Sequence, residues 1–187
     1  ALVAGLTIQD VRERPEAERA RADQLHARFV DPLGDLMTLL NLWNYLQEKH
    51  RELSSSAFRR LCRAEFLNYV RVREWMDLVR QLKRVERDLR ARGRGQEIQA
   101  ASTAEAVHRS VLAGLLSRLG VRDDTQPRVS PRGRDGGARR KPAQEYLGSR
   151  GTRFVLHPGS VLAQRPPEFV MSVELVETSR LFARVNA

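Results

Sequence analysis

The 187-residue sequence contains one cysteine, Cys62, only three lysines, and no long apolar run. A single cysteine excludes an internal disulfide framework and a cysteine-based zinc site. A membrane-spanning helix needs roughly 20 apolar residues, so we expect no membrane partner. The apolar residues 1–8 are too few for a signal peptide, and no basic leader precedes them. We therefore expect a cytoplasmic protein.

The sequence also lacks the motifs that carry common catalytic chemistry. It has no G-x-x-x-x-G-K-[ST] phosphate loop, no G-x-G-x-x-G after a predicted strand and no G-x-S-x-G elbow. His26, His50, His108 and His157 stand far apart, and none has metal-ligand spacing to another histidine or to an acid. We predict that the first three are packed or solvated and that Cys62 is a small buried hydrophobe. We therefore expect no catalytic residue, metal ligand or cofactor in this chain.

Positive charge is the property that the chain has in excess. It carries 33 Lys and Arg against 23 Asp and Glu, a net charge of +10, and all but three of the basic residues are arginines. A strongly basic protein favours a polyanionic partner, usually nucleic acid, and arginine binds phosphates and bases bidentately. A GC-rich genome would also produce this arginine content. Composition alone leaves the two explanations open.

The first 120 residues have the apolar spacing of helices. The strongest pattern runs over residues 36–50, where apolar side chains recur at helical spacing. A second helix is predicted over 68–91, with Asn68 as its cap and a buried stripe that includes Leu82 and Leu89. Ser102 and Glu105 form a capping box for a further helix that Gly120 would end. We expect a helical bundle in this half.

The composition changes after residue 120. Residues 121–143 are rich in Gly, Pro and Arg and have no periodicity, as in a basic linker or loop. Strands are predicted over 153–157, 169–176 and 181–185, and the alternation in the second places every odd residue from Phe169 to Leu175 on one face. The predicted class is therefore α+β: a helical domain (1–120), the linker (121–143) and a small antiparallel β-barrel (144–187).

Several segments resemble the DEAH-box RNA helicases in that family's order. Residues 34–44, GDLMTLLNLWN, resemble the helix motif GDxLTLLNxxN of that family. Residues 8–15 look like the segment that precedes the family's helical ratchet domain. Residues 53–62 and 65–75 look like the bacterial HrpA-type version of that domain. Residues 157–160, HPGS, with 173–178, VELVET, resemble the HPxS and ELVxT pair of the family's oligonucleotide-binding (OB) fold.

This resemblance implies a fragment of an ATP-dependent helicase. The chain begins at Ala1 rather than Met and ends at Ala187 after a strand-like run. It would comprise the ratchet region and an OB fold cut before its final segment. The RecA-like domains, with the ATP and magnesium that they bind, would lie elsewhere in the parent chain. The implied partners are single-stranded RNA, with DNA as the open alternative, and those RecA-like domains; we expect a monomer.

In the helical half, three residues are candidate nucleic-acid contacts. Asn41 lies off the apolar stripe, and the family resemblance places it in a domain that lines the channel for single-stranded RNA. Its amide would equally serve as a solvated group or a cap to a neighbouring helix. Arg71 and Arg73 lie on a face where basic and acidic residues alternate at i+3 and i+4, as in Arg73–Asp77. That pattern is also typical of a solvated, self-paired face.

In the β half, the candidates are Arg153, His157 and Ser160. Arg153 begins a predicted strand, and the other two occupy the turn that follows it. OB folds bind single strands through basic grooves and loop residues, while His157 would equally fix the turn by a structural hydrogen bond. Two functions remain: a nucleic-acid-binding accessory region that holds single-stranded RNA, or a protein-interaction module that receives a helicase-activating or ribosome-associated partner.

Overall fold

The computed structural model describes residues 1–93, 103–125, 144–177 and 180–186. The chain divides into two compact units. The helical unit comprises residues 1–31 and 36–102, and the β unit comprises residues 32–35 and 103–187. The division near residue 102 differs from the expected boundary at 120. From residue 126 onward, the predicted linker lies outside the described residues.

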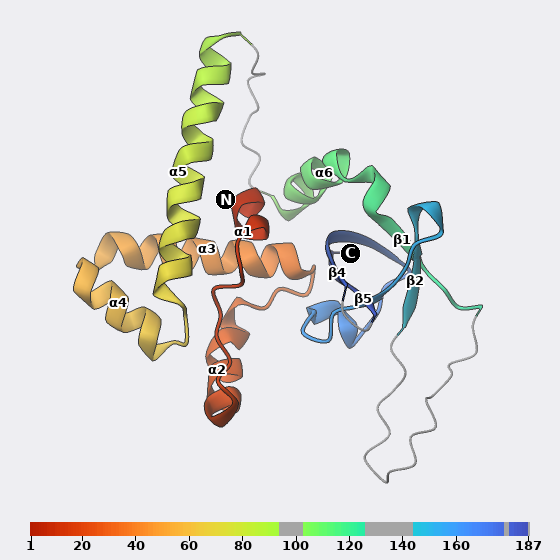
Figure 1. The fold of residues 1–187 in the computed structure, drawn as a ribbon, viewed down its shortest axis with the longest axis horizontal. Coiled ribbons are helices and arrows are strands. Elements are labelled where there is room, and N and C mark those ends of the chain that lie inside the picture. The colour runs from red at the N-terminus through yellow and green to blue at the C-terminus, as the bar shows by residue number, and fades with distance from the viewer. Residues whose placement is uncertain (94–102, 126–143, 178–179, 187) are drawn as a thin grey trace. The chain divides into compact units, whose positions relative to one another are not determined.

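The helical unit follows the predicted periodicity closely. Its two longest helices confirm the predictions over 36–50 and 68–91, and they cross one another in Figure 1. Its elements are α1 (Leu2–Thr7), η1 (Glu16–Glu18), α2 (Arg19–His26), η2 (Ala27–Phe29), α3 (Asp35–Glu52), α4 (Ser55–Ala64) and α5 (Tyr69–Ala91). The Ser54 hydroxyl caps α4, and the Asn68 side chain caps α5 by accepting a hydrogen bond from the Arg71 amide at 3.1 Å.

The core of this unit is aromatic at its centre. The rings of Trp43 in α3 and Trp75 in α5 lie 4.9 Å apart, and Trp75 is fully buried. Such aromatic pairs contribute about 0.5–1.5 kcal/mol beyond the burial of their area. The remaining buried residues around them include Val11, Phe29, Leu42, Leu46, Phe58, Cys62, Leu67, Val72 and Val79.

The second half of α5 departs from the prediction. Leu82 and Leu89 were expected in the buried stripe, but they are 41% and 44% exposed. The helical spacing is correct, and every described residue from Arg80 onward in this helix is exposed. Periodicity thus identifies the helix but does not specify how much of it has a partner to pack against.

The β unit is a closed five-stranded barrel, which confirms the predicted fold class. Strands neighbour one another in the order β1-β2-β3-β5-β4, and only the β3–β5 pairing is parallel. The elements are α6 (Ala104–Gly114), η3 (Leu116–Arg118), β1 (Leu119–Arg122), β2 (Glu145–Gly148), η4 (Ser149–Gly151), β3 (Arg153–Leu156), η5 (Val161–Ala163), β4 (Phe169–Glu177) and β5 (Leu181–Asn186).

The start and end of α6 also differ from the prediction. Thr103 caps it, and its Oγ1 accepts a hydrogen bond from the Ala106 amide at 3.2 Å. The predicted cap Ser102 lies outside the described residues. Gly120 does not end this helix but lies within β1, where the absence of a Cβ atom leaves room for the ring of Phe154.

A β-bulge between Ser172 and Glu174 sets which residues of β4 face the core. Before the bulge, Val170 is 1% exposed and packs in the core, while Phe169 is 62% exposed. After it, Leu175 packs against the core. The prediction that every odd residue from Phe169 to Leu175 faces inward is therefore wrong at Phe169, because the extra residue shifts the alternation.

Candidate nucleic-acid interface

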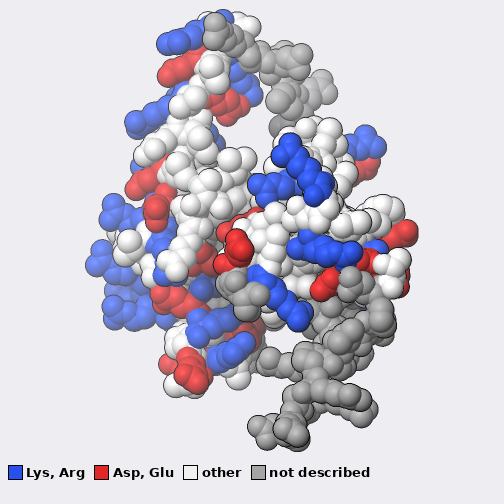
Figure 2. All heavy atoms as spheres, turned by 45° about the vertical axis from the view of Figure 1, so that its right-hand side comes forward, with Lys and Arg blue, Asp and Glu red and all other residues white. Residues whose placement is uncertain are grey.

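Helix α4 presents a row of arginines beside the core. Phe58 and Cys62 are buried one turn apart. Because residues four apart share a helix face, Arg59 and Arg63 also lie on one face, and both are exposed. Basic side chains gather at the left edge of the molecule in Figure 2.

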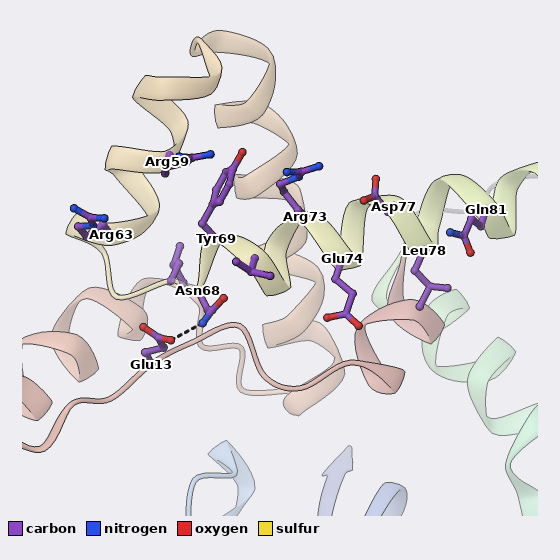
Figure 3. Close-up of a pocket in the computed structure, with 12 residues that line it drawn as sticks. Glu13, Arg59, Arg63, Asn68, Tyr69, Arg73, Glu74, Asp77, Leu78 and Gln81 are labelled. Atoms are coloured by element: carbon purple, nitrogen blue, oxygen red, sulfur yellow. Dashed lines mark hydrogen bonds between the residues drawn. The ribbon is translucent and has the colours of Figure 1, made fainter.

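Helix α5 contributes an aromatic ring and a further arginine to the same surface. Tyr69 and Arg73 are four residues apart and lie on adjacent turns. The Arg59 guanidinium lies over the Tyr69 ring, 4.9 Å from its centroid, in the geometry of a cation–π contact. Figure 3 shows Arg59 and Arg63 from α4 on the same side of α5 as Tyr69 and Arg73. We call Arg59, Arg63, Tyr69 and Arg73 the α4–α5 basic surface.

Two open hollows adjoin this surface. One has a volume of about 930 Å³ and is lined by all four of its residues. The other, of about 510 Å³, shares Tyr69 and Arg73 and extends over Trp43 towards Lys83. No carboxylate is among the described residues that line the second hollow. Tyr69 and Arg73 therefore project between two hollows of the helical unit.

The acids near the first hollow do not neutralise these arginines. Glu13 accepts a hydrogen bond from the Asn68 side chain at 2.7 Å, and Asp77 pairs with Arg80. Glu74 points away from Arg73 in Figure 3. Among the described residues, the expected pair Arg73–Asp77 does not form, and no ion pair involves Arg59, Arg63 or Arg73.

Of the predicted contacts in the helical unit, only Arg73 joins this surface. Arg71 is half-buried, and its Nη1 donates to the Asp10 carbonyl oxygen at 2.9 Å. Asn41 is also half-buried, and its Nδ2 donates to the Phe29 carbonyl oxygen at 3.3 Å. Both side chains therefore tie distant parts of the helical unit together.

The three candidates of the β unit are each held by neighbours. Arg153 is exposed and pairs with Asp123 at 2.5 Å and Glu145 at 3.6 Å. Hydrogen bonds from Thr125, and then from Arg153, hold the pKa of Asp123 below its usual value. The ionised form of the carboxylate that faces Arg153 is therefore favoured.

His157 and Ser160 shape the turn after β3. The exposed His157 accepts a hydrogen bond from the Gly159 amide on Nδ1 at 3.1 Å. Ser160 is only 6% exposed, and its Oγ accepts from the Leu162 amide at 3.4 Å as the cap of η5. The structure thus gives both side chains a local role in the turn of the β unit, whereas the α4–α5 basic surface belongs to the helical unit.

Sequence reasoning missed Arg59, Arg63 and Tyr69. The sequence signal that could have found the two arginines is their i,i+4 spacing. Arg59 directly follows Phe58, and Arg63 directly follows Cys62, so the arginines repeat with the same period as the apolar pair. Tyr69 gave no signal of its own, because its position over Arg59 depends on how α4 and α5 meet.

Two observations on the described residues concern metal binding and thiol chemistry. No group of three or more His, Cys, Asp or Glu side chains among them is placed to hold a metal ion. Burial raises the pKa of the Cys62 thiol to about 11, so it is protonated at neutral pH.

Comparison with known proteins identifies the relatives of the chain. Residues 107–187 match the family described as oligonucleotide/oligosaccharide-binding (OB)-fold. The whole chain is similar to the ATP-dependent RNA helicase HrpA of Escherichia coli, with 43% identity over 186 residues, which are 13% of that protein. The HrpA homolog of Haemophilus influenzae is 37% identical over the same share of each chain.

A human relative is more distant. The probable ATP-dependent RNA helicase DHX35 is 22% identical over 185 residues, or 98% of this chain and 22% of that protein. No helix among the described residues has the length and apolar character needed to cross a membrane. The chain spans about an eighth of the length of the two bacterial relatives. The resemblance seen in the motifs is confirmed: the chain is related to the HrpA-type RNA helicases over its whole length and carries an OB fold in residues 107–187.

Proposed function

We propose that this chain is the nucleic-acid-binding accessory region of an ATP-dependent RNA helicase and that its α4–α5 basic surface holds single-stranded RNA. The observation that carries the proposal is the set of three arginines around Tyr69 that form no ion pair with described residues. Unpaired guanidinium groups gain most from phosphates, which they bind bidentately. The ATP-hydrolysing RecA-like domains, with their magnesium, would belong to the rest of the parent chain.

The ring of Tyr69 gives this surface a second mode of contact. Single-strand-binding proteins combine a basic groove with aromatic side chains on which bases stack, at about 1–3 kcal/mol per base. Tyr69 lies between the two hollows, and Arg59 and Arg73 flank it. A strand whose phosphates contact the arginines would bring a base onto this ring, in a manner that tolerates any sequence.

The test is a salt titration of affinity for a fluorescent oligouridylate. The triple variant Arg59→Gln, Arg63→Gln, Arg73→Gln should bind more weakly, and its slope of log affinity against log salt should fall by about 2, at roughly 0.7 for each phosphate contact. The control removes the same charge from Arg19, Arg90 and Arg109, which are exposed and paired with acids. If the two triple variants changed affinity and salt slope equally, only the net charge of the chain would matter, and the proposal would be wrong.

A specific feature of the barrel favours the alternative, a protein-interaction module. Val121 in β1 is paired directly with Leu147 in β2 and with Phe169 in β4, and all three side chains are exposed. Contiguous exposed apolar side chains on a sheet often mark a protein interface. A helicase-activating or ribosome-associated partner bound there would show weak salt dependence, in contrast to RNA.

A further inference from the structure

A small hollow in the β unit has the same charge character as the α4–α5 basic surface. Its volume is about 260 Å³, and it lies where η3 meets the turn between β2 and β3. Among its described lining residues, Phe154 and Leu175 contribute apolar surface, and Arg118 and Arg150 contribute the charges. None of these described lining residues carries a carboxylate. We call it the η3–η4 hollow.

The two arginines of this hollow differ from others on the barrel. Arg122, Arg153 and Arg184 each form an ion pair with an acid. Arg118 and Arg150 are exposed, and neither forms an ion pair with any residue in the described parts of the chain. Three strand arginines of the barrel are thus paired with acids, whereas the two arginines at this hollow are not.

Two hydroxyl groups fix the backbone that carries Arg118. The Ser149 Oγ donates to the Ser117 carbonyl oxygen at 2.5 Å. The Ser172 Oγ donates to the Arg118 carbonyl oxygen at 2.9 Å. These bonds hold η3 against the β2–β3 turn and against β4. The two arginines are thus brought to the same hollow by main-chain anchoring, so their side chains stay available.

Arg150 also occupies a backbone conformation that suits glycine better. Its φ is 59° and its ψ is 24°, in the left-handed region that non-glycine residues rarely adopt. Strained residues of this kind gather at functional sites, where the surrounding structure maintains them. A glycine here would relieve the strain but remove the charge.

We propose that the η3–η4 hollow binds a phosphate group through Arg118 and Arg150. The inference goes beyond the α4–α5 basic surface and stands if that surface binds nothing. Its ligand is either a phosphodiester of a single-stranded nucleic acid or a free phosphate, since both present the same oxygens to a guanidinium. The small volume accommodates a phosphate with part of its nucleotide rather than a folded nucleic acid.

The experiment follows backbone amide signals of the chain by nuclear magnetic resonance, with inorganic phosphate and with oligouridylate as separate probes. We expect Gly148, Ser149 and Gly151 to shift in a saturable manner. Arg118→Gln with Arg150→Gln should abolish the shifts and lower the oligouridylate salt slope by about 1.4, or 0.7 per contact. The matched control, Arg122→Gln with Arg184→Gln, should leave the shifts in place.

The outcomes are distinct. Shifts with oligouridylate but not with inorganic phosphate identify a strand phosphodiester, and comparable saturation by both identifies a general phosphate site. Shifts that survive in the double variant, or are absent with both probes, overturn the proposal. The single variant Arg150→Gly controls for misfolding, because glycine readily adopts a φ of 59°. This variant should have a higher melting temperature than the parent chain and smaller amide shifts. Shifts of undiminished size would count against a role for Arg150. The α4–α5 triple variant in the same titration tests the proposed function separately.

Discussion

The guanidinium of Arg59 lies 4.9 Å from the ring centroid of Tyr69, although α4 ends and a turn intervenes between the two residues. The cation on one face of the ring orients it and leaves it beside two hollows. An arginine over an aromatic ring and a base on an aromatic ring are both favourable contacts of the π face. Under the proposed function, the pair would combine a phosphate-binding guanidinium with a ring on which a base stacks.

Replacing Tyr69 should separate stacking from hydrogen bonding. Tyr69→Leu should weaken oligouridylate binding by about 5- to 150-fold, the equivalent of 1–3 kcal/mol per stacked base, without changing the salt slope. Tyr69→Phe keeps the ring and should bind like the parent chain. Fluorescence anisotropy at several salt concentrations measures both quantities. Equal affinity of the leucine and phenylalanine variants would show that no base stacks on this residue.

Arg71 and Arg73 should respond in opposite ways to the same substitution. Arg71→Gln loses a charged hydrogen bond to the Asp10 carbonyl oxygen, so the free energy of unfolding should fall by about 1.5–3 kcal/mol. Arg73→Gln is a surface change and should alter it by less than about 0.5 kcal/mol, while lowering the RNA salt slope by about 0.7. Thermal unfolding beside RNA titration decides the matter, and a stable Arg71 variant with weakened RNA binding would reverse the two assignments.

The fold was predictable wherever periodicity and caps act locally. The apolar stripe of 36–50 and the Asn68 cap locate α3 and α5 within about two residues. The exposed half of α5 was not predictable, because Leu82 and Leu89 have helical spacing whether or not anything packs on them. The bulge in β4 was not predictable either, since it depends on pairing with β5 rather than on the sequence of β4 alone.

The register of β4 provides a direct test of the bulge. Val170→Asp places an unpaired charge in the barrel core and should unfold the β unit. Phe169→Asp, one residue away, changes a side chain that is mostly exposed and should leave the barrel folded. Amide signals of the helical unit serve as an internal reference in both variants. If the Val170→Asp barrel folded and the Phe169→Asp barrel did not, Phe169 rather than Val170 would face the core, as simple alternation predicts.

The candidate site was less predictable than the fold. Charge identified Arg71 and Arg73 equally, and only the structure separates them, because Arg71 reaches the backbone at Asp10 whereas Arg73 lies beside Tyr69 and the hollows. Arg153 was placed at a strand start correctly, but its partner Asp123 lies 30 residues earlier and gave no sequence signal. Whether a basic residue is free or paired is a property of tertiary structure.

Gly120 and Gly114 should give stability changes of opposite sign. A Cβ at Gly120 would lie 2.5 Å from Cζ of Phe154, so Gly120→Ala should destabilise the barrel by about 1–3 kcal/mol through overpacking. A Cβ at Gly114, the last residue of α6, meets nothing within 4 Å. Gly114→Ala should therefore stabilise the chain by up to about 1 kcal/mol. Chemical denaturation measures both, and a neutral Gly120→Ala would show that Phe154 can move away.

The hydroxyl of Tyr45 should make the helical unit sensitive to alkaline pH. This hydroxyl donates a hydrogen bond to the Glu65 carboxylate at 2.8 Å. Burial is the largest cause, and this hydrogen bond the second, that raises the pKa of Tyr45 to about 12. The ordinary value is about 10, so between these two pH values the folded chain binds more protons than the unfolded chain. The stability that this tyrosine contributes is therefore fully present below pH 10 and is lost as the pH rises towards 12.

The measurement is the free energy of unfolding from urea titrations at pH 8 to 11, for the parent chain and for Tyr45→Phe. The phenylalanine variant should be less stable at pH 8, because the Glu65 carboxylate loses a donor. The difference between the two proteins should shrink above pH 10, since only the parent chain carries the Tyr45 hydroxyl that resists ionisation when folded. Tyr69→Phe is the matched control and should show no such convergence. A constant difference from pH 8 to 11 would mean that the Tyr45 pKa is not raised by folding.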